Sequence, residues 1–197
     1  MLATQLTAAG ERCSTTPRQT EGPFYPLKFP VDQDTDLTLV EGHLERALGE
    51  KIIISGRILT SDCQPIEAAK VEIWQACASG RYNHEYDPNQ APLDPNFQYW
   101  SYATTGVDGK YSFTTIKPGS YRVTTDWKRP PHIHFKVSAP NLPPLITQLY
   151  FSEEEELNQK DRILQRVPPQ QRSQVITDLT SDSSLDARVG RFNIVLS

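Results

Sequence analysis

The chain is poor in cysteine: it has only three in 197 residues, and none belongs to a Cys-x-x-Cys pair. Because the number is odd, at least one thiol has no partner within the chain. Cys77 lies in an apolar stretch, where a buried free thiol is expected. The alternative is a disulfide between Cys63 and Cys77, which would be typical of an exported protein. Cysteine usage therefore leaves the compartment open.

Long hydrophobic runs and an excess of charge of one sign are also absent. No apolar stretch approaches the roughly 20 residues of a transmembrane helix, and the first residues lack the basic start and apolar run of a signal peptide. Acidic and basic residues are interspersed and give a net charge of −4, so neither nucleic acid nor a membrane is an expected partner. We expect a soluble protein, cytoplasmic by default and exported if a signal segment preceded Met1.

The pattern of the sequence predicts one all-β domain. No repeat, low-complexity tract or break in composition marks a second domain, so we expect an N-terminal arm over residues 1–20 and one domain over residues 21–197. Sixteen prolines and ten glycines separate short runs rich in β-branched and aromatic residues, which is typical of a two-sheet β-sandwich. The predicted strands are Lys51–Ile58, Lys70–Trp74, Lys110–Thr115, Ser120–Thr125, His132–Ser138, Leu145–Phe151 and Arg191–Leu196.

Only two segments look helical, and both lie late in the chain. One is a short turn near Leu157–Gln165, and the other is Pro169–Leu179, where proline is tolerated in the first turn. The sandwich is therefore expected to carry one or two short helical turns near its C-terminus.

Two histidines in one predicted strand form the clearest candidate site. His132 and His134 are two residues apart, and alternate side chains of a strand leave the same face of a sheet, so both rings can bind one metal ion. Arg129 and two prolines precede them, and prolines beside a strand restrict how the chain enters it. The alternative is that both histidines are polar residues on the exposed face of an edge strand.

Two tyrosines, Tyr82 and Tyr121, each follow a glycine-containing turn signal. Tyrosines commonly flank strands in sandwiches, so packing alone would also account for both. If they join the histidines, the donor set indicates iron(III), because this hard ion favours oxygen donors and holds phenolates at neutral pH.

Seven ordered segments between residues 16 and 196 resemble the intradiol ring-cleavage dioxygenases, nearest to the branch that cleaves protocatechuate. The matching segments are Thr20–Pro26 (TEGPFYP), Val71–Ala76 (VEIWQA), Gly80–Tyr82 (GRY), Ala91–Phe97 (APLDPNF), Thr115–Gly119 (TIKPG) with Tyr121, Arg129–Phe135 (RPPHIHF) and Thr147–Phe151 (TQLYF).

The resemblance implies one mononuclear non-haem Fe(3+) ion per chain, bound by Tyr82, Tyr121, His132 and His134. It further implies that a catechol and O2 are the substrates and that the ring opens between its two hydroxyl-bearing carbons, with protocatechuate the leading candidate and 3-carboxy-cis,cis-muconate its product. In this scheme the catechol displaces Tyr121, which accepts a proton. Arg129 stabilises the electron density that develops on the ring.

Five further residues match positions that line or border the catechol pocket in this family: Tyr25, Trp74, Gln148, Gly22 and Pro23. Tyr25 is a candidate hydrogen-bond partner for a ring carboxylate, whereas a core tryptophan and a buried glutamine are sensible alternatives for Trp74 and Gln148. The sequence departs from the family pattern after Tyr121, where Arg122 replaces a common proline. This departure affects the expected rim of the pocket.

Three other functions stay open at this stage. The same chemistry could act on catechol or hydroxyquinol. A ferrous extradiol enzyme would instead use two histidines and one carboxylate. A non-catalytic β-sandwich that binds ligands or sugars would keep the fold without iron. Because one chain contains the whole ligand set, we expect a homo-oligomer.

Overall fold

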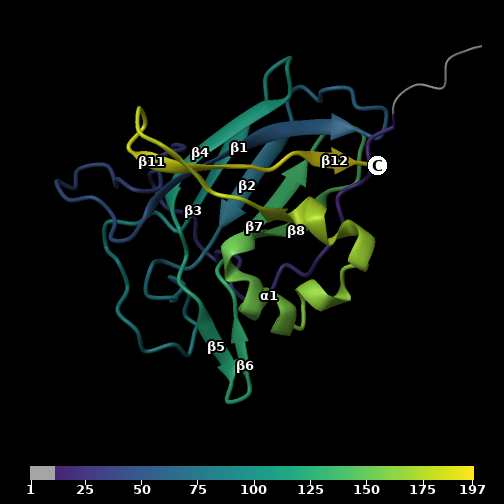
Figure 1. The fold of residues 1–197 in the computed structure, drawn as a ribbon. Coiled ribbons are helices and arrows are strands. Elements are labelled where there is room, and N and C mark those ends of the chain that lie inside the picture. Colours follow the sequence, from purple (N-terminus) through teal and green to yellow (C-terminus); the bar gives the residue numbers. More distant parts are fainter. Residues whose placement is uncertain (1–11) are drawn as a thin grey trace, which may run out of the picture.

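The computed structural model describes residues 12–197, which form two five-stranded sheets and a small hairpin (Figure 1). In sheet 1, β1 lies between β4 on one side and β11 and β12 on the other, and β10 pairs with β11. Sheet 2 has the order β3–β2–β7–β8–β9. The strands of sheet 1 are β1 (Lys51–Thr60), β4 (Lys110–Ile116), β10 (Thr180–Asp182), β11 (Ala187–Arg191) and β12 (Ile194–Leu196).

The strands of sheet 2 are β2 (Lys70–Trp74), β3 (Trp100–Thr104), β7 (His132–Ser138), β8 (Leu145–Phe151) and β9 (Ile176–Thr177). The hairpin consists of β5 (Tyr121–Thr124) and β6 (Trp127–Arg129) and projects away from both sheets (Figure 1). Four short helical segments connect β8 to β9, namely η1 (Ser152–Glu154), α1 (Glu155–Lys160), η2 (Leu164–Arg166) and η3 (Pro169–Val175). The architecture confirms the predicted all-β sandwich with short helical turns near its C-terminus.

The hydrophobic core lies between the sheets and is built by alternate residues of the strands. Ile52 and Ile54 of β1 are fully buried there, and so are Ile133 and Phe135 of β7. The residues between them form the outer faces of the two sheets. Each outer face can therefore carry polar side chains.

Every predicted strand overlaps an observed one, but two predicted elements needed correction and the strand β3 was missed. Trp100–Thr104 was not predicted as a strand, because the bulky Trp and Tyr side chains leave no clear alternation. The predicted strand Arg191–Leu196 is divided into β11 and β12, because Phe192 turns into the core between them. The predicted helix Pro169–Leu179 ends at Val175, and the next residues pair with β8 instead.

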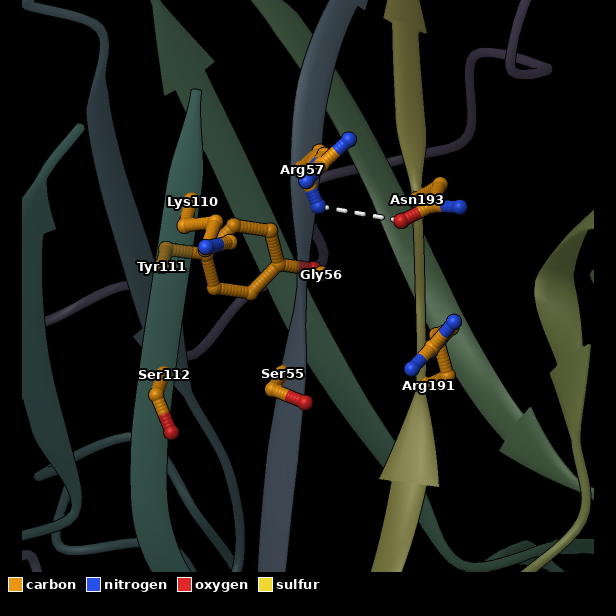
Figure 2. A pocket seen from close by; sticks show the side chains of 8 residues that line it. All are labelled: Ser55, Gly56, Arg57, Lys110, Tyr111, Ser112, Arg191 and Asn193. Carbon is orange, nitrogen blue, oxygen red and sulfur yellow. Dashed lines mark hydrogen bonds between the residues drawn. The ribbon is translucent and has the colours of Figure 1, made fainter. Parts of the chain in front are cut away.

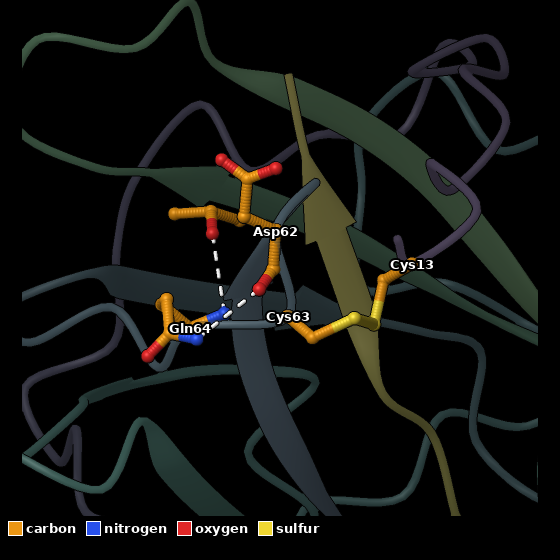
Figure 3. Close-up of a disulfide and its surroundings, with 5 residues drawn as sticks. Cys13, Asp62, Cys63 and Gln64 are labelled. Carbon is orange, nitrogen blue, oxygen red and sulfur yellow. Dashed lines mark hydrogen bonds between the residues drawn. A yellow bond between two sulfur atoms is a disulfide. The ribbon is translucent and has the colours of Figure 1, made fainter. Parts of the chain in front are cut away.

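The cysteine pairing also differs from the expected alternatives. Cys13 and Cys63 form a disulfide, with their Cα atoms 5.3 Å apart (Figure 3). Cys77 is a buried free cysteine, as expected, and so the Cys63–Cys77 pairing is wrong. Cys77 instead lies within hydrogen-bond distance of the Ser79 hydroxyl.

The N-terminal segment is attached along the domain wherever the structure describes it. The Thr16 N–H donates to the Val195 carbonyl, and the Gln19 N–H donates to the Ile146 carbonyl. The segment thereby passes from the end of sheet 1 to the outer face of sheet 2. Part of the arm predicted over residues 1–20 lies outside the described residues, and the boundary at residue 21 stays a prediction. Within residues 12–197, no helix is long and apolar enough to cross a membrane.

Candidate metal centre

The two histidines lie on the outer face of β7, in the interior of sheet 2. Their neighbours Ile133 and Phe135 point into the core, as the alternation predicts. Both imidazoles are nonetheless buried, with 2% exposure each, and β7 is flanked by β2 and β8. The alternative of an exposed edge strand is therefore wrong, because the N-terminal segment covers this face.

Gly22 and Trp74 enclose His134 from two sides. Gly22 has a φ of +71°, and a Cβ atom there would lie 3.3 Å from Cε1 of His134, so glycine allows the N-terminal segment to approach the ring closely. The Trp74 ring stacks on His134 with centroids 4.7 Å apart and an interplanar angle of 11°. Pro23, next to Gly22, is exposed, so the cover is thin at this point.

The two tyrosines approach the histidines from the loop after β2 and from the start of β5. The Tyr82 backbone N–H donates to the Asp87 carboxylate at 2.7 Å, which holds the loop in place. The Tyr82 Oη atom lies 3.2 Å from Nε2 of His132. The Tyr121 ring centroid is 5.7 Å from those of both Tyr82 and His132. The structure thus brings all four predicted ligands together.

The protonation of the two imidazoles suits metal binding. Nδ1 of His132 lies 2.7 Å from the Pro130 carbonyl, which can only accept, so Nδ1 carries the proton and Nε2 keeps its lone pair. Nδ1 of His134 is buried and has no hydrogen-bond partner among the described residues. Burial, and secondly the charge of Arg129, hold the pKa of both rings well below the usual range, so both are neutral at pH 7.

The spacing of the donors also suits one cation. Two ligands that bind one ion at about 2 Å along perpendicular directions lie about 3 Å apart. The 3.2 Å between Tyr82 Oη and His132 Nε2 is close to this value. No group of three His, Cys, Asp or Glu residues with metal-binding geometry occurs in residues 12–197. A two-histidine, one-carboxylate site therefore has no support among these residues, and the oxygen donors that lie beside the two histidines are the phenols of Tyr82 and Tyr121.

Burial raises the pKa of both phenols, so they remain protonated without a cation. For Tyr82 the nearby Tyr121 raises the pKa further, whereas the positive charge of Arg129 opposes the effect of burial on both tyrosines. A trivalent ion would release both protons, because it stabilises the phenolates far more strongly than burial disfavours them. The donor set of two phenols and two neutral imidazoles therefore fits iron(III).

Arg129 is buried beside the four candidate ligands and is held by three side chains. Its Nε donates to the Asp161 carboxylate at 2.8 Å. Its Nη2 donates to Oε1 of Gln148 at 2.7 Å and to the Tyr150 hydroxyl at 3.2 Å. Burial favours the neutral form, but the partners outweigh it and raise the pKa of Arg129 above its usual value. Arg129 is thus a fixed positive charge at the site.

Asp161 and Tyr150 were missed by sequence reasoning. Asp161 follows α1, is fully buried, and also accepts the backbone N–H groups of Ile163 and Leu164 through Oδ1. It lies 32 residues after Arg129 in sequence, so no local pattern links the two. Tyr150 could have been found, because it lies two residues after Gln148 on the same strand face.

The candidate substrate residues occupy different environments. Gln148 is fully buried, and its Nε2 donates to the Thr20 carbonyl, so its amide supports Arg129 and the N-terminal segment. The Tyr25 hydroxyl donates to the Glu72 carboxylate at 2.9 Å. Burial and this carboxylate raise the pKa of Tyr25. The Tyr25 ring packs edge-on against Trp74, with ring centroids 5.0 Å apart.

Comparisons with known proteins identify relatives of this chain. A family model described as "Dioxygenase" matches residues 20–197. The protocatechuate 3,4-dioxygenase beta chain of Burkholderia cepacia is 37% identical over 185 residues, covering 91% of this chain and 78% of the relative. Catechol 1,2-dioxygenase 2 of Acinetobacter lwoffii is 34% identical over 147 residues, covering 68% of this chain and 50% of the relative.

A solved structure shows that the fold is shared as well. The intradiol ring-cleavage dioxygenase of Tetranychus urticae has a TM-score of 0.71 at 23% identity, with 94% of this chain and 95% of that chain covered. The family match over nearly the whole chain and the 37% identity to a relative agree with this likeness. The chain belongs to the intradiol ring-cleavage dioxygenase family.

Proposed function

We propose that this protein is a ferric dioxygenase that cleaves a catecholic ring between its two hydroxyl-bearing carbons, with protocatechuate as the leading substrate. The observation that carries the proposal is the convergence of two phenols and two neutral imidazoles on one buried face. Tyr82, Tyr121, His132 and His134 would hold the ion. When bound, iron(III) would supply the positive charge that lets a catechol bind as its dianion.

The protein's own groups keep the site ordered before any ligand binds. The hydrogen bond from His132 to Pro130 sets the tautomer and ring orientation, which leaves Nε2 available as a donor. Stacking on Trp74 holds the His134 ring. The Phe24 ring lies over Tyr82 with centroids 4.7 Å apart and excludes water from that side. These contacts lower the entropy lost when the ligands bind one ion.

Tyr121 would be suited to take a proton from the substrate. It is only partly buried and belongs to the two-stranded hairpin outside both sheets, whereas Tyr82 is buried under Phe24. Burial raises the pKa of Tyr121, so its phenolate is a competent base once it is no longer bound. The hairpin pairs Tyr121 with Arg129, which keeps the phenol beside a positive charge.

Arg129 would stabilise negative charge that develops on the substrate ring. Its partners hold it rigidly, so the charge needs no reorganisation during the reaction, which is the condition under which such electrostatic stabilisation is strongest. Asp161 is a positioning residue in this scheme, because it contacts Arg129 and none of the candidate ligands.

The surroundings of Tyr25 bear on the choice of substrate. Because the Tyr25 hydroxyl is engaged by the Glu72 carboxylate, a substrate carboxylate can use Tyr25 only by replacing Glu72. This observation favours the second candidate, in which the same chemistry acts on the uncharged rings of catechol or hydroxyquinol. The 37% identity to a protocatechuate 3,4-dioxygenase chain favours the first.

Turnover by the iron-loaded protein on protocatechuate, catechol and hydroxyquinol, with the products identified by mass spectrometry, tests the function. Intradiol cleavage adds both oxygen atoms of O2 to the opened ring, so a product formed under isotopically heavy O2 should carry the label. Cleavage of catechol or hydroxyquinol alone would replace protocatechuate as substrate. A protein that stays iron-free and inactive after reconstitution would instead be a non-catalytic ligand-binding sandwich.

The assembly and the compartment are further parts of the proposal. Relatives named as beta and alpha chains of protocatechuate 3,4-dioxygenase support an oligomer, and the presence of all four candidate ligands in one chain favours a homo-oligomer. The Cys13–Cys63 disulfide is of a kind that persists in oxidising compartments, which supports an exported protein over a cytoplasmic one. Light scattering gives the oligomeric state, and thiol labelling of protein taken from its native compartment gives the redox state.

A further inference from the structure

A sizeable hollow lies on the outer face of sheet 1, away from the candidate metal centre. It has a volume of about 590 Å³ and is formed by side chains of β1, β4, β11 and the segment before β12 (Figure 2). The lining residues are Ser55, Gly56, Arg57, Lys110, Tyr111, Ser112, Arg191 and Asn193. Its volume is within the range of small-molecule sites, about 300–1,000 Å³.

The division between β11 and β12 shapes the floor of this hollow. Phe192 turns inward, its N–H donates to the Ser55 carbonyl, and its own carbonyl accepts the Tyr111 hydroxyl at 2.5 Å. A Cβ atom on Gly56 would lie 1.8 Å from the Phe192 carbonyl oxygen, so only glycine fits there. The Asn193 side chain accepts the Arg57 N–H at 3.0 Å and replaces the missing strand pairing (Figure 2).

The hollow concentrates positive charge in a protein whose net charge is −4. Arg57, Lys110 and Arg191 all line it, and no carboxylate does. Lys110 forms an ion pair with Asp108 at 2.7 Å, and Arg57 adds only a weaker attraction to the same carboxylate. The guanidinium groups of Arg57 and Arg191 make no hydrogen bond or ion pair within residues 12–197. By contrast, Arg188 on the same strand as Arg191 binds two carboxylates, those of Glu50 and Glu153.

The register of the strands spreads these charges apart. Arg57 lies opposite Lys110, whereas Arg191 lies opposite Ser55, two residues before Arg57 in β1. With about 3.3 Å per residue and about 4.8 Å between strands, the backbones of Arg57 and Arg191 are roughly 8 Å apart. Ser55, which pairs with Arg191, and Ser112, which pairs with Ser55 from β4, add hydroxyl donors to the lining. Two arginines on adjacent strands can each pair with a separate carboxylate of one molecule, whereas a single phosphate offers only one anionic group.

We propose that this hollow binds a small polycarboxylate, with Arg57 and Arg191 each pairing with a different carboxylate group. Arginine suits this role because its planar guanidinium binds a carboxylate through two parallel hydrogen bonds. Lys110 and the hydroxyl of Ser112 complete the donors on the β4 side. The site is separate from the iron chemistry, since no lining residue contacts the candidate metal ligands.

Citrate is the probe for the test, titrated calorimetrically into the wild-type protein and the double variant Arg57→Gln/Arg191→Gln at constant ionic strength. We expect one citrate per chain for the wild type and an affinity at least tenfold lower for the double variant. The glutamines keep the backbone N–H of Arg57 and its bond to Asn193, so the fold should persist. Arg166→Gln removes one charge at an exposed site outside the hollow and should leave citrate affinity unchanged.

Three results would overturn the proposal. The first is no citrate binding by the wild type at millimolar concentration. The second is equal affinity in the double variant, or an equal loss in Arg166→Gln, either of which would show a general charge effect. The third is inorganic phosphate or a DNA duplex binding more tightly than citrate through the same arginines. Ring-cleavage turnover of the double variant is expected to equal that of the wild type, so this test is independent of the proposed dioxygenase function.

A second variant keeps the test decisive if the double variant fails to fold. Ser112→Glu places a carboxylate among the arginines from an exposed position on β4, without removing any of them. We expect it to abolish citrate binding while the thermal unfolding midpoint stays the same or rises. Unchanged citrate affinity in Ser112→Glu would contradict the assigned location.

Discussion

The outer faces of the two sheets follow the same alternation but have opposite surroundings. On sheet 1, Arg57 and Arg191 face solvent from a hollow. On sheet 2, His134 and Gln148 occupy equivalent outward positions and are almost completely buried. The difference comes from the N-terminal segment and the loop after β2, which cover sheet 2 and leave sheet 1 open. The alternation along a strand decides which face of the sheet a residue occupies. The segments that pack over that face decide whether the residue is buried, and burial decides its protonation state and partners.

Burial changes what the polar groups on the covered face can do. A buried charge needs partners, and Arg129 has them in Asp161, Gln148 and Tyr150. Buried imidazoles become neutral and therefore competent ligands. The cations on the open face stay solvated and can exchange water for a ligand that arrives from solution. We therefore expect substitutions on the covered face to have much larger effects.

The largest effect is expected for Tyr82→Phe, which removes one oxygen donor from the covered face. Loss of groups that merely support ligands typically costs about 10–100-fold in metal affinity, so loss of a direct ligand should exceed about 100-fold. Iron per chain after dialysis measures this effect. The control is Tyr86→Phe, which removes the same atom from an exposed ring. Equal iron content in Tyr82→Phe and wild type would remove Tyr82 from the ligand set.

The variants Arg129→Ala, on the covered face, and Arg191→Ala, on the open face, compare the two faces directly. For Arg129→Ala we expect about 100-fold or greater loss of turnover with iron retained. It should also lower the free energy of unfolding by about 3–5 kcal/mol, because Asp161 is left buried without its partner. Arg191→Ala should change the free energy of unfolding by less than about 0.5 kcal/mol. Urea unfolding and turnover measure both variants.

Two results would revise the role of Arg129. An Arg129→Ala protein that contains no iron would show that this residue maintains the metal ligands. Arg129→Lys keeps the charge, but the lysine cannot donate to Asp161 and Gln148 at the same time with the geometry of the planar guanidinium. The turnover of this variant should therefore lie between those of the alanine variant and the wild type. Full activity of Arg129→Lys would show that positioning by the planar group is unnecessary.

Asp161→Asn tests whether positioning on the covered face matters separately from charge. The amide oxygen can still accept the N–H groups of Ile163 and Leu164, but the charged bond to Arg129 is lost. We expect a loss of about 1.5–3 kcal/mol in stability, together with a lower kcat and little change in KM. A kcat equal to that of the wild type would show that Asp161 serves folding alone.

The smallest effect concerns a solvent-accessible ion-pair cluster that links η1 to sheet 1. Glu153 pairs with Arg188 and Lys117, and these hydrogen bonds lower its pKa from 4.5 to about 2. Because the folded-state pKa is depressed, the stabilisation is present above about pH 4.5 and is lost as the pH falls through about 2. Solvent and salt screen this cluster, so the contribution should be below about 1 kcal/mol.

The free energy of unfolding, measured from about pH 5 to about pH 2, checks the contribution of the Glu153 ion pairs, with Glu153→Gln as the comparison. The wild type should lose more stability than Glu153→Gln over this range, and salt at about 1 M should reduce the difference. Parallel pH curves for the two proteins would contradict the assigned contribution.

The sequence predicted the four candidate ligands because each depended on a local pattern. His132 and His134 were paired by strand alternation, and Tyr82 and Tyr121 were added by their turns and by the family resemblance. The burial of the histidines was not predictable from β7 alone, because the cover comes from residues more than a hundred positions earlier. The same limit explains why Asp161 was missed.

In the fold too, features set by local sequence patterns were predicted, whereas features set by contacts between distant segments were not. Alternation in β1 and β7 predicted their buried faces, whereas Cys13 could not be paired with Cys63 by spacing. The hollow on sheet 1 was also hidden, because it depends on Phe192 leaving a strand that the sequence presented as continuous. Contacts between distant segments are set by packing of the whole domain.

The visible absorption spectrum of the purified protein, recorded as iron(III) is added, tests the central claim most directly. If Tyr82 and Tyr121 both bind the ion as phenolates, charge transfer should produce a wine-red protein that saturates at one iron per chain. Tyr82→Phe should weaken the band and Tyr86→Phe should not. A protein that binds iron and stays colourless would contradict the account, because the ion would then lie away from the two phenols.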